Sequence, residues 1–229
     1  MKLRILLAVL FGLTGVVLLC WLGVWQVQRL DWKQGILAEI EARIGAPPGV
    51  LPNQPDPDRD RYLPVRAHGR TGESEILIQS SHKTYGPGFR VITPFVIADG
   101  RRVLLDRGFI LARDRDTDRP PLTMTVTGNL HWPDEIDMFT PEPDHETGLW
   151  FARDIPTLAD ALNTEPVLIV LRASDEDAPV ILPLPVTADG IPNDHLQYAI
   201  TWFLLAAVWA GMSIYLVITL MRRAEESQP

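Results

Sequence analysis

The sequence predicts a membrane protein of the α+β class. Two transmembrane helices, one near each end of the chain, are expected to pair as a hairpin and to flank a β-rich domain with one short helix. Two runs without Asp, Glu, Lys or Arg predict the helices: Ile5–Gln28, of 24 residues, and Leu196–Met221, of 26 residues. A helix needs about 20 mostly apolar residues to cross the hydrocarbon core. Between these runs, short apolar segments separated by Gly, Pro and Asp predict strands.

The first run predicts an uncleaved membrane anchor over residues 5–28. The alternative is a signal peptide, which ends in a small-residue pattern of the Ala-x-Ala type. The run ends instead in Leu19-Cys20-Trp21-Leu22-Gly23-Val24-Trp25, which lacks that pattern. With only four residues before the run, we also expect no mitochondrial presequence.

The helix is expected to continue beyond the membrane over residues 29–44. Ile36, Ile40 and Ile44 are spaced along one helical stripe. Gly45 and six prolines follow, and they predict an extended linker over residues 45–64.

Basic residues at both ends of the chain predict the orientation. Lys2 and Arg4 precede the first span, and Arg222 and Arg223 follow the second span, over residues 195–221. Short flanks rich in Lys and Arg remain in the cytoplasm. We therefore expect a multi-pass protein of the bacterial inner membrane, with cytoplasmic termini and a periplasmic central domain. The formal net charge of −8 argues against a nucleic-acid partner, and the single Cys20 excludes an internal disulfide.

The central domain, over residues 62–190, is predicted to be mostly β. Asp99-Gly100 predicts a tight hairpin between two of its strands, because this pair supplies positive φ angles. Asp154 is expected to cap a short helix over Ile155–Leu162. A small barrel or sandwich would protect the strand edges. The expected strands are Tyr62–His68, Glu75–Gln79, Phe89–Ile97, Arg102–Ile110, Leu122–Leu130 and Val167–Leu171, with at best an edge strand over Pro179–Val186.

The usual signatures of an enzyme are absent from the sequence. It has no Gly-x-Ser-x-Gly, no His-Glu-x-x-His and no phosphate-binding loop. His68, His82, His131 and His145 show no metal-ligand spacing. We therefore expect a protein that is not an enzyme.

His195 is the one candidate ligand, because it opens the second apolar run. Asn193 or Asp194 can cap the helix and place His195 in its first turn. An imidazole beside an aromatic face at the membrane boundary suits haem, whose iron accepts a neutral imidazole. An interface histidine within the usual aromatic belt is the alternative, and the residues alone leave both open. The residues expected to share its face are Tyr198, Ala199, Trp202, Ala206 and Trp209.

The first span offers aromatic and small residues of its own. Trp21, Trp25 and Trp32 fall on one stripe, which is also typical of an aromatic belt. Gly12 and Gly23 would allow the two helices to approach closely.

Five segments, in this order, resemble the surfeit-locus family of cytochrome c oxidase assembly factors. The resemblance covers essentially the whole chain, from the first span to the second. The segments are Gly23–Lys33 (GVWQVQRLDWK), Phe89–Phe95 (FRVITPF), Val103–Ile110 (VLLDRGFI), Trp150–Asp154 (WFARD, followed by Glu165-Pro166) and His195–Trp202 (HLQYAITW).

The resemblance implies a role in supplying haem a to subunit I of an aa3-type oxidase, next to haem A synthase. It also implies that His195 takes part in haem binding. If His195 ligates the haem iron from the first turn of the helix, we expect the porphyrin to lie against Tyr198, Trp202 and the small positions Ala199 and Ala206. A membrane-anchored scaffold that stabilises an oxidase intermediate without binding haem is the alternative. Asp106 and Phe109 stand where the family usually has Asn and often has Trp. An ion pair with Arg107 is expected to absorb the added charge.

Overall fold

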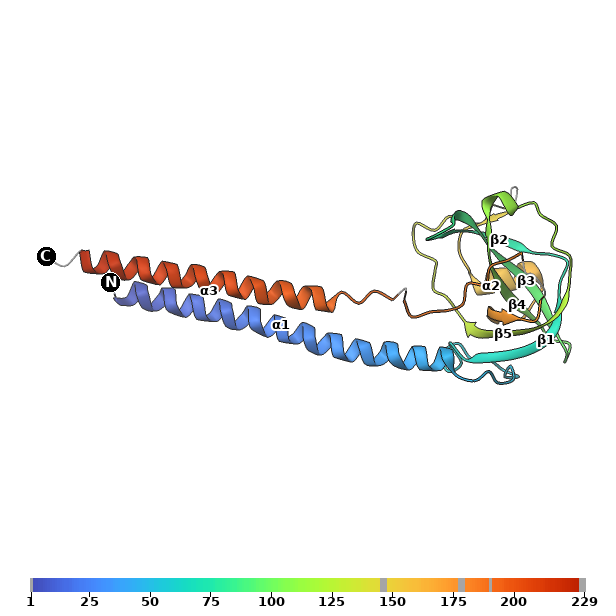
Figure 1. Ribbon diagram of the computed structural model, residues 1–229, viewed down its shortest axis with the longest axis horizontal. Coiled ribbons are helices and arrows are strands. Elements are labelled where there is room, and N and C mark those ends of the chain that lie inside the picture. The colour runs from blue at the N-terminus through green and yellow to red at the C-terminus, as the bar shows by residue number, and fades with distance from the viewer. Residues whose placement is uncertain (1, 145–147, 177–179, 190, 227–229) are drawn as a thin grey trace. The chain divides into compact units, whose positions relative to one another are not determined.

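The computed structural model describes residues 2–144, 148–176, 180–189 and 191–226. They divide into a helical unit, Met1–Glu39 with Asp189–Pro229, and a sheet unit, Ile40–Ala188. The elements are α1 (Lys2–Gly45), β1 (Pro64–Thr71), β2 (Ile76–His82), β3 (Gly86–Ile97), β4 (Arg102–Leu111), the 3₁₀ turn η1 (Ala112–Asp114), β5 (Thr123–His131), β6 (Leu149–Trp150), α2 (Ile155–Leu162), β7 (Leu168–Ser174) and α3 (His195–Glu226) (Figure 1).

The helical unit is an antiparallel pair of α1 and α3, with both chain termini at one end (Figure 1). Both helices are long and apolar enough to cross a membrane. Glycines on α1 allow the close approach. A Cβ added at Gly12 would lie 2.7 Å from the Ser213 Cβ atom, and one at Gly23 would lie 2.8 Å from the Phe203 ring. Small residues bring helix backbones together in this way where lipid provides no hydrophobic drive for association.

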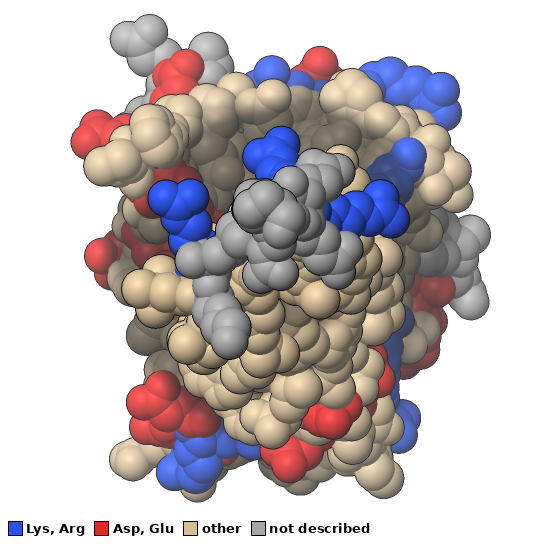
Figure 2. Space-filling model, turned by 90° about the vertical axis from the view of Figure 1, so that its left-hand side faces the viewer, with Lys and Arg blue, Asp and Glu red and all other residues tan. Residues whose placement is uncertain are grey.

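Basic side chains gather at the end of the helix pair that carries both termini. Arg4 near the start of α1 is exposed there, as are Arg222 and Arg223 near the end of α3. Figure 2 faces this end and shows blue Lys and Arg groups standing around it.

The sheet unit is a mixed sheet whose strand pairings form a closed circuit. The order is β1-β5-β7-β4-β3-β2-β6, and β1 pairs with β3 as well. Strands β1, β5, β7 and β4 are therefore each bonded to two neighbours, and β3 is bonded to three, namely β4, β2 and β1. Only β4 with β7 and β2 with β6 are parallel, and the other pairs are antiparallel.

Both faces of the central strands are buried, in two separate hydrophobic clusters. Side chains alternate along a strand. On β4, Leu105 therefore enters one cluster with Phe95 and Leu130, while Leu104 enters the other. That second cluster lies beneath α2, which contributes Leu158 and Leu162. Burial on both faces explains why the strand predicted near residue 168 is a continuous apolar run.

The strands predicted from the sequence all form, with ends shifted by at most three residues, except the last. Over residues 180–186 only a single bridge forms, between Leu182 and Phe109, and position 179 lies outside the described residues. The helix α2 has the predicted bounds and begins after Asp154, whose side chain accepts a hydrogen bond from the Thr157 hydroxyl rather than capping a backbone N–H. Within the proline-rich segment, Leu51 is buried in the core.

The hairpin between β3 and β4 has a three-residue loop instead of the predicted tight one. Ile97 and Arg101 close the ladder, and the Gly100 N–H donates to the Ile97 oxygen at 2.9 Å. Gly100 has φ +87°, and a side chain there would point into open space. Gly100 therefore has the positive φ angle that Asp99-Gly100 predicted, but it lies in a three-residue loop and not in a two-residue loop.

A β-bulge in β4 places Gly108 against another part of the chain. The register shifts there, so that Ile92 pairs with Asp106 but Val91 pairs with Gly108. Gly108 has φ +119°, and a methyl group on it would overlap the Leu182 carbonyl oxygen. Neighbouring Phe109 exchanges two backbone hydrogen bonds with Leu182, at 2.7 and 2.9 Å. Only glycine fits this position.

We expect Gly108→Ala to lower the free energy of unfolding by more than about 3 kcal/mol, because it adds a backbone clash to an unfavourable φ. Gly100→Ala is the matched control, since its φ is also positive but its surroundings are open. It should cost only about 1 kcal/mol. Urea unfolding of the two full-length variants in detergent measures the difference, and equal losses would contradict the crowding at Gly108.

Candidate functional site

His195 is the first residue of α3, as the sequence predicted. The Asp194 carbonyl accepts the Tyr198 N–H at 3.1 Å, which makes Asp194 the capping residue by its backbone. The His195 Nδ1 atom lies 2.8 Å from the Oε1 atom of Gln26 on α1. Gln26 is only 9% exposed. The structure therefore joins the first and last of the five sequence segments through one side-chain contact inside the helical unit.

The residues expected to share a face with His195 differ in how exposed they are. Tyr198 is 56% exposed, and Trp202 is half-buried, so both have ring surface that a ligand can cover. Ala199 and Ala206 are 2% and 5% exposed. Within the expected face, the two alanines are therefore buried, while Tyr198 and Trp202 keep accessible ring surface.

The aromatic stripe of α1 remains largely exposed. Trp21, Trp25 and Trp32 are 61%, 47% and 51% exposed. The Arg29 guanidinium lies 3.7 Å above the centre of the Trp32 ring, a cation–π contact. One turn further, the Lys33 ammonium donates a hydrogen bond to the Pro192 carbonyl, just before α3. The start of α3 is therefore held to α1 by two contacts. One involves the Pro192 backbone and the other involves the His195 side chain.

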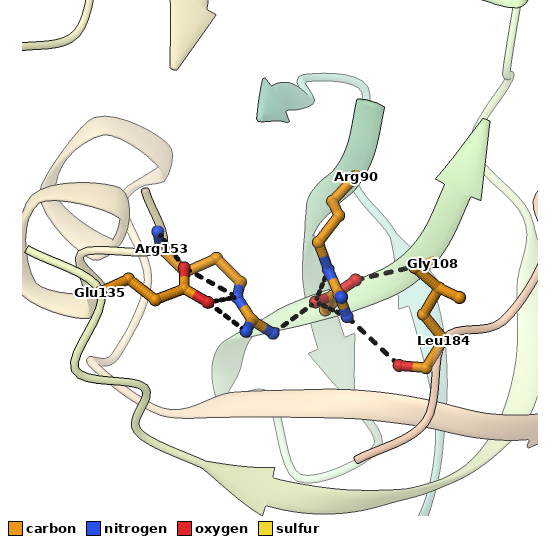
Figure 3. A network of polar contacts seen from close by, with 6 residues as sticks. Arg90, Gly108, Glu135, Arg153 and Leu184 are labelled. Atoms are coloured by element: carbon orange, nitrogen blue, oxygen red, sulfur yellow. Dashed lines mark hydrogen bonds and ion pairs between the residues drawn. The ribbon is translucent and has the colours of Figure 1, made fainter. Parts of the chain in front are cut away.

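A second polar cluster lies in the sheet unit, around a carboxylate that water does not reach. Asp106 on β4 is 0% exposed. Arg90 on β3 donates to it from Nε at 2.8 Å, and Arg153 donates at 3.3 Å. The Gly108 N–H also donates, at 3.1 Å, and so fixes the bulge. Figure 3 shows the guanidinium groups of Arg90 and Arg153 directed toward the same place.

The same two arginines extend the cluster to flanking loops. Arg90 donates to the Leu184 carbonyl at 3.2 Å, and Arg153 binds the Glu135 carboxylate through several N–H groups (Figure 3). Burial alone would raise the pKa of Glu135, but the hydrogen bonds and charge of Arg153 hold that pKa below its usual range. Each charge has a partner, so the cluster is built to hold the fold together.

The expected ion pair between Asp106 and Arg107 does not form. Arg107 occupies the bulge and binds Glu176 instead, with an N–O distance of 3.1 Å. Successive side chains on a strand point to opposite faces, so adjacency in sequence does not bring Asp106 and Arg107 together. Three of the five sequence segments, those containing Arg90, Asp106 and Arg153, therefore serve this cluster.

His131, which showed no special pattern in the sequence, lies beside the cluster. Its ring stacks on Tyr62 with centroids 5.5 Å apart. Its Nδ1 atom is buried and has no hydrogen-bond partner among the residues described. Burial, together with the positive charges of Arg153 and Arg61, lowers the pKa of His131 to about 4. The ring is therefore neutral at neutral pH.

His68 and His82 lie apart from any site. His68 contacts the Thr125 hydroxyl at 3.2 Å, and His82 accepts the Thr84 N–H within its own turn. His145 lies outside the described residues. Among the residues that the structure describes, no three His, Cys, Asp or Glu side chains come together as a metal site.

Sequence reasoning missed Gln26 as a partner of His195. The signal was a polar amide inside an otherwise apolar run, at the boundary of the predicted membrane segment. Such a residue needs a hydrogen-bond partner in lipid. Periodicity could not name that partner, because it lies 169 residues away.

The depressed pKa of His131 predicts an acid-sensitive sheet unit. Between pH 6.5 and about 4 the unfolded chain binds a proton at this histidine and the folded chain does not, so stability falls as pH falls. From pH 7 to pH 5 the free energy of unfolding should drop by about 2 kcal/mol. Chemical unfolding of the full-length protein followed by near-UV circular dichroism measures this. His131→Gln should reduce the pH dependence; an unchanged slope would show that His131 is not responsible.

Comparison with known proteins supports the resemblance shown by the five segments. The model of the SURF1 family matches residues 13–207. Surfeit locus protein 1 of Rattus norvegicus is 30% identical over 210 residues, which cover 81% of this chain and 68% of the relative. The Homo sapiens protein of that name is 29% identical over 211 residues, covering 81% and 69%, and the SURF1-like protein of Dictyostelium discoideum is 24% identical over 235 residues, covering 81% and 87%. The chain thus belongs to the SURF1 family, the surfeit-locus family of cytochrome c oxidase assembly factors that its segments resemble.

Proposed function

We propose that this protein carries haem a during the assembly of an aa3-type cytochrome c oxidase. It would hold the haem at His195 and pass it to oxidase subunit I, next to haem A synthase. Haem a is the cargo of this reaction, so the protein must both bind and release it. Assembly of the oxidase, rather than catalysis, is the role of the family to which the chain belongs.

The observation that carries this proposal is the state of His195. Its ring is half-buried at the start of an apolar helix, and its Nδ1 atom is occupied by Gln26. Its Nε2 atom has no hydrogen-bond partner in the described part of the chain. A neutral imidazole with one nitrogen free is the common axial ligand of haem iron.

The neighbouring residues fit an apolar ligand with two acidic groups. Tyr198 and Trp202 supply ring surface on α3, next to lipid-facing helix surface. Arg29 supplies a cation near the same boundary, where it would attract the haem propionates. The alanines at positions 199 and 206 are excluded from this role by their burial.

A second candidate is a scaffold that never binds haem. The contact between Gln26 and His195 supports the scaffold in part, because an interface histidine needs a hydrogen-bond partner and Gln26 is one. In this case the sheet unit would bind an oxidase intermediate, and His195 would only join the two helices.

We further propose that the sheet unit lies in the periplasm as a small barrel and that both termini are cytoplasmic. The closed circuit of strand pairings supports the barrel. Arg4, Arg222 and Arg223 at one end of the helix pair support the orientation in an inner membrane. The close packing of Gly12 and Gly23 on α3 supports a first helix that is retained.

A reporter that is active only in the periplasm tests the orientation. Inserted near Asp114, in the exposed turn after β4, it should be active. Fused after Pro229, it should be inactive. The reverse pattern would contradict the proposed placement.

The variant His195→Ala tests whether the protein is a carrier. We expect full-length wild-type protein, purified in detergent from cells that make haem a, to show a Soret band. The variant should lose haem by more than about tenfold, because it loses the coordinate bond. In a strain lacking the native gene, it should also restore less haem a to the oxidase. Trp202→Ala removes only packing and should have a smaller effect.

His68→Ala is the control, since His68 lies in the sheet unit and should not affect haem content. A variant His195→Ala with full haem and an unaltered Soret band would show that His195 is not the ligand. Wild-type protein without haem, combined with loss of oxidase assembly in the deletion strain, would favour the scaffold.

A further inference from the structure

Gln26 is a buried amide in an interface otherwise built from small and apolar residues. It lies one turn from Gly23, where the helices are so close that an added Cβ would meet the Phe203 ring, and it is 9% exposed. Burying an amide in an apolar environment is costly unless it is hydrogen-bonded. Its Oε1 atom meets the His195 Nδ1 atom at 2.8 Å. The hydrogen bond therefore accounts for the presence of a polar side chain at this point of α1.

The chemistry of the two groups decides where the His195 proton lies. An amide oxygen only accepts hydrogen bonds, so the Nδ1 atom facing it must carry the proton. In a neutral imidazole the Nε2 atom then carries the free lone pair. If the amide NH₂ group faced the ring instead, the proton would lie on Nε2, and that nitrogen could not bind a metal. In the structure the Oε1 atom faces the ring, and this orientation of the amide goes with a free Nε2 lone pair.

We propose that Gln26 is the positioning residue of the haem site: it holds the His195 ring in the Nδ1–H tautomer and directs the Nε2 atom to the haem iron. This inference rests on the proposed haem ligation by His195 and adds the residue that prepares it. Partners of this kind, which bind the second nitrogen of a metal-bound histidine, fix the ring and raise its basicity.

The other contacts of the helix pair do not fix the ring. Lys33 binds the Pro192 carbonyl and holds the backbone before α3, and Gly23 sets the spacing of the helices. Rotation of the imidazole about its χ angles remains free under both contacts. Among the described residues, Gln26 is the one hydrogen-bond partner of the imidazole, so removing it should change the ring without separating the helices.

A neutral amide also suits a carrier better than a carboxylate. A carboxylate on Nδ1 would give the ring more negative character and strengthen the bond from Nε2 to iron. It would also be costly to bury beside the membrane. With Gln26, the ring is oriented while the bond remains weak enough to break at transfer.

The first test is the tautomer of His195 in the protein without haem. Full-length protein labelled with ¹⁵N-histidine is examined by NMR in detergent, and the His195 signals are assigned by their loss in His195→Ala. We expect the Nδ1–H form in the wild type and in Gln26→Glu, which keeps an acceptor. Gln26→Leu and the shorter Gln26→Asn should give a mixture or the Nε2–H form. Gln28→Leu, an exposed position on the same helix, should match the wild type.

The second test is binding of added haem a to the same proteins. Gln26→Leu and Gln26→Asn should bind about 10–100-fold more weakly. Gln26→Glu should bind at least as tightly as the wild type and release haem more slowly. Gln28→Leu should be unchanged. Asn and Glu are both polar, but Asn is too short to reach Nδ1 and Glu reaches it with a charged acceptor. Different binding by these two variants would therefore report the acceptor on Nδ1 and not helix packing.

Two results would overturn the inference. One is an Nε2–H tautomer in the wild type; the other is unchanged haem affinity in both Gln26→Leu and Gln26→Asn while His195→Ala loses haem. Failure of the underlying function looks different: the wild type would bind no haem a, whatever the tautomer. If Gln26→Leu does not insert, Gln26→Asn and Gln26→Glu still decide the question.

Discussion

The sheet unit depends on one interaction, the burial of the Asp106 carboxylate between Arg90 and Arg153. A charge with no exposure to water destabilises a fold strongly unless its partners are in place. Here the partners come from β3, from the loop before α2 and from the backbone of the bulge itself. Through Arg90 and Arg153 the same carboxylate also fixes the loops at Leu184 and Glu135. The bulge in β4, the segment at Leu184 and the loop before α2 therefore all depend on the same carboxylate.

The helical unit solves a related problem by a different means. Its interface is made close by glycines, and this closeness allows a short polar side chain to cross between the helices. Gln26 meets His195 one turn from Gly23, whose missing side chain leaves room for the Phe203 ring. The five family segments thus divide into two groups, three that build the charged cluster and two that meet at His195.

The sequence was informative where structure is local. Apolar runs predicted the two long helices, and helical spacing predicted α2 with its bounds. Partners distant in sequence were not predictable. The pairing of Asp106 with Arg90, and not with the adjacent Arg107, is a contact between two strands that no local pattern shows. The two-residue β6 was too short to leave a periodic signal. His195 stood out because a titratable residue at a membrane boundary is unusual, but its amide partner required the folded chain.

The contact between Gln26 and His195 has a consequence for biosynthesis. Gln26 is made early and His195 is made late, with the whole sheet unit translated between them. Contacts so distant in sequence form only after the intervening chain has been made and its loop closed. The contact between Gln26 and His195 therefore forms only when both α1 and α3 have been made and have packed together. Under the proposed carrier role, a truncated or half-inserted product would have no haem site, and haem would not be bound by an unfinished chain.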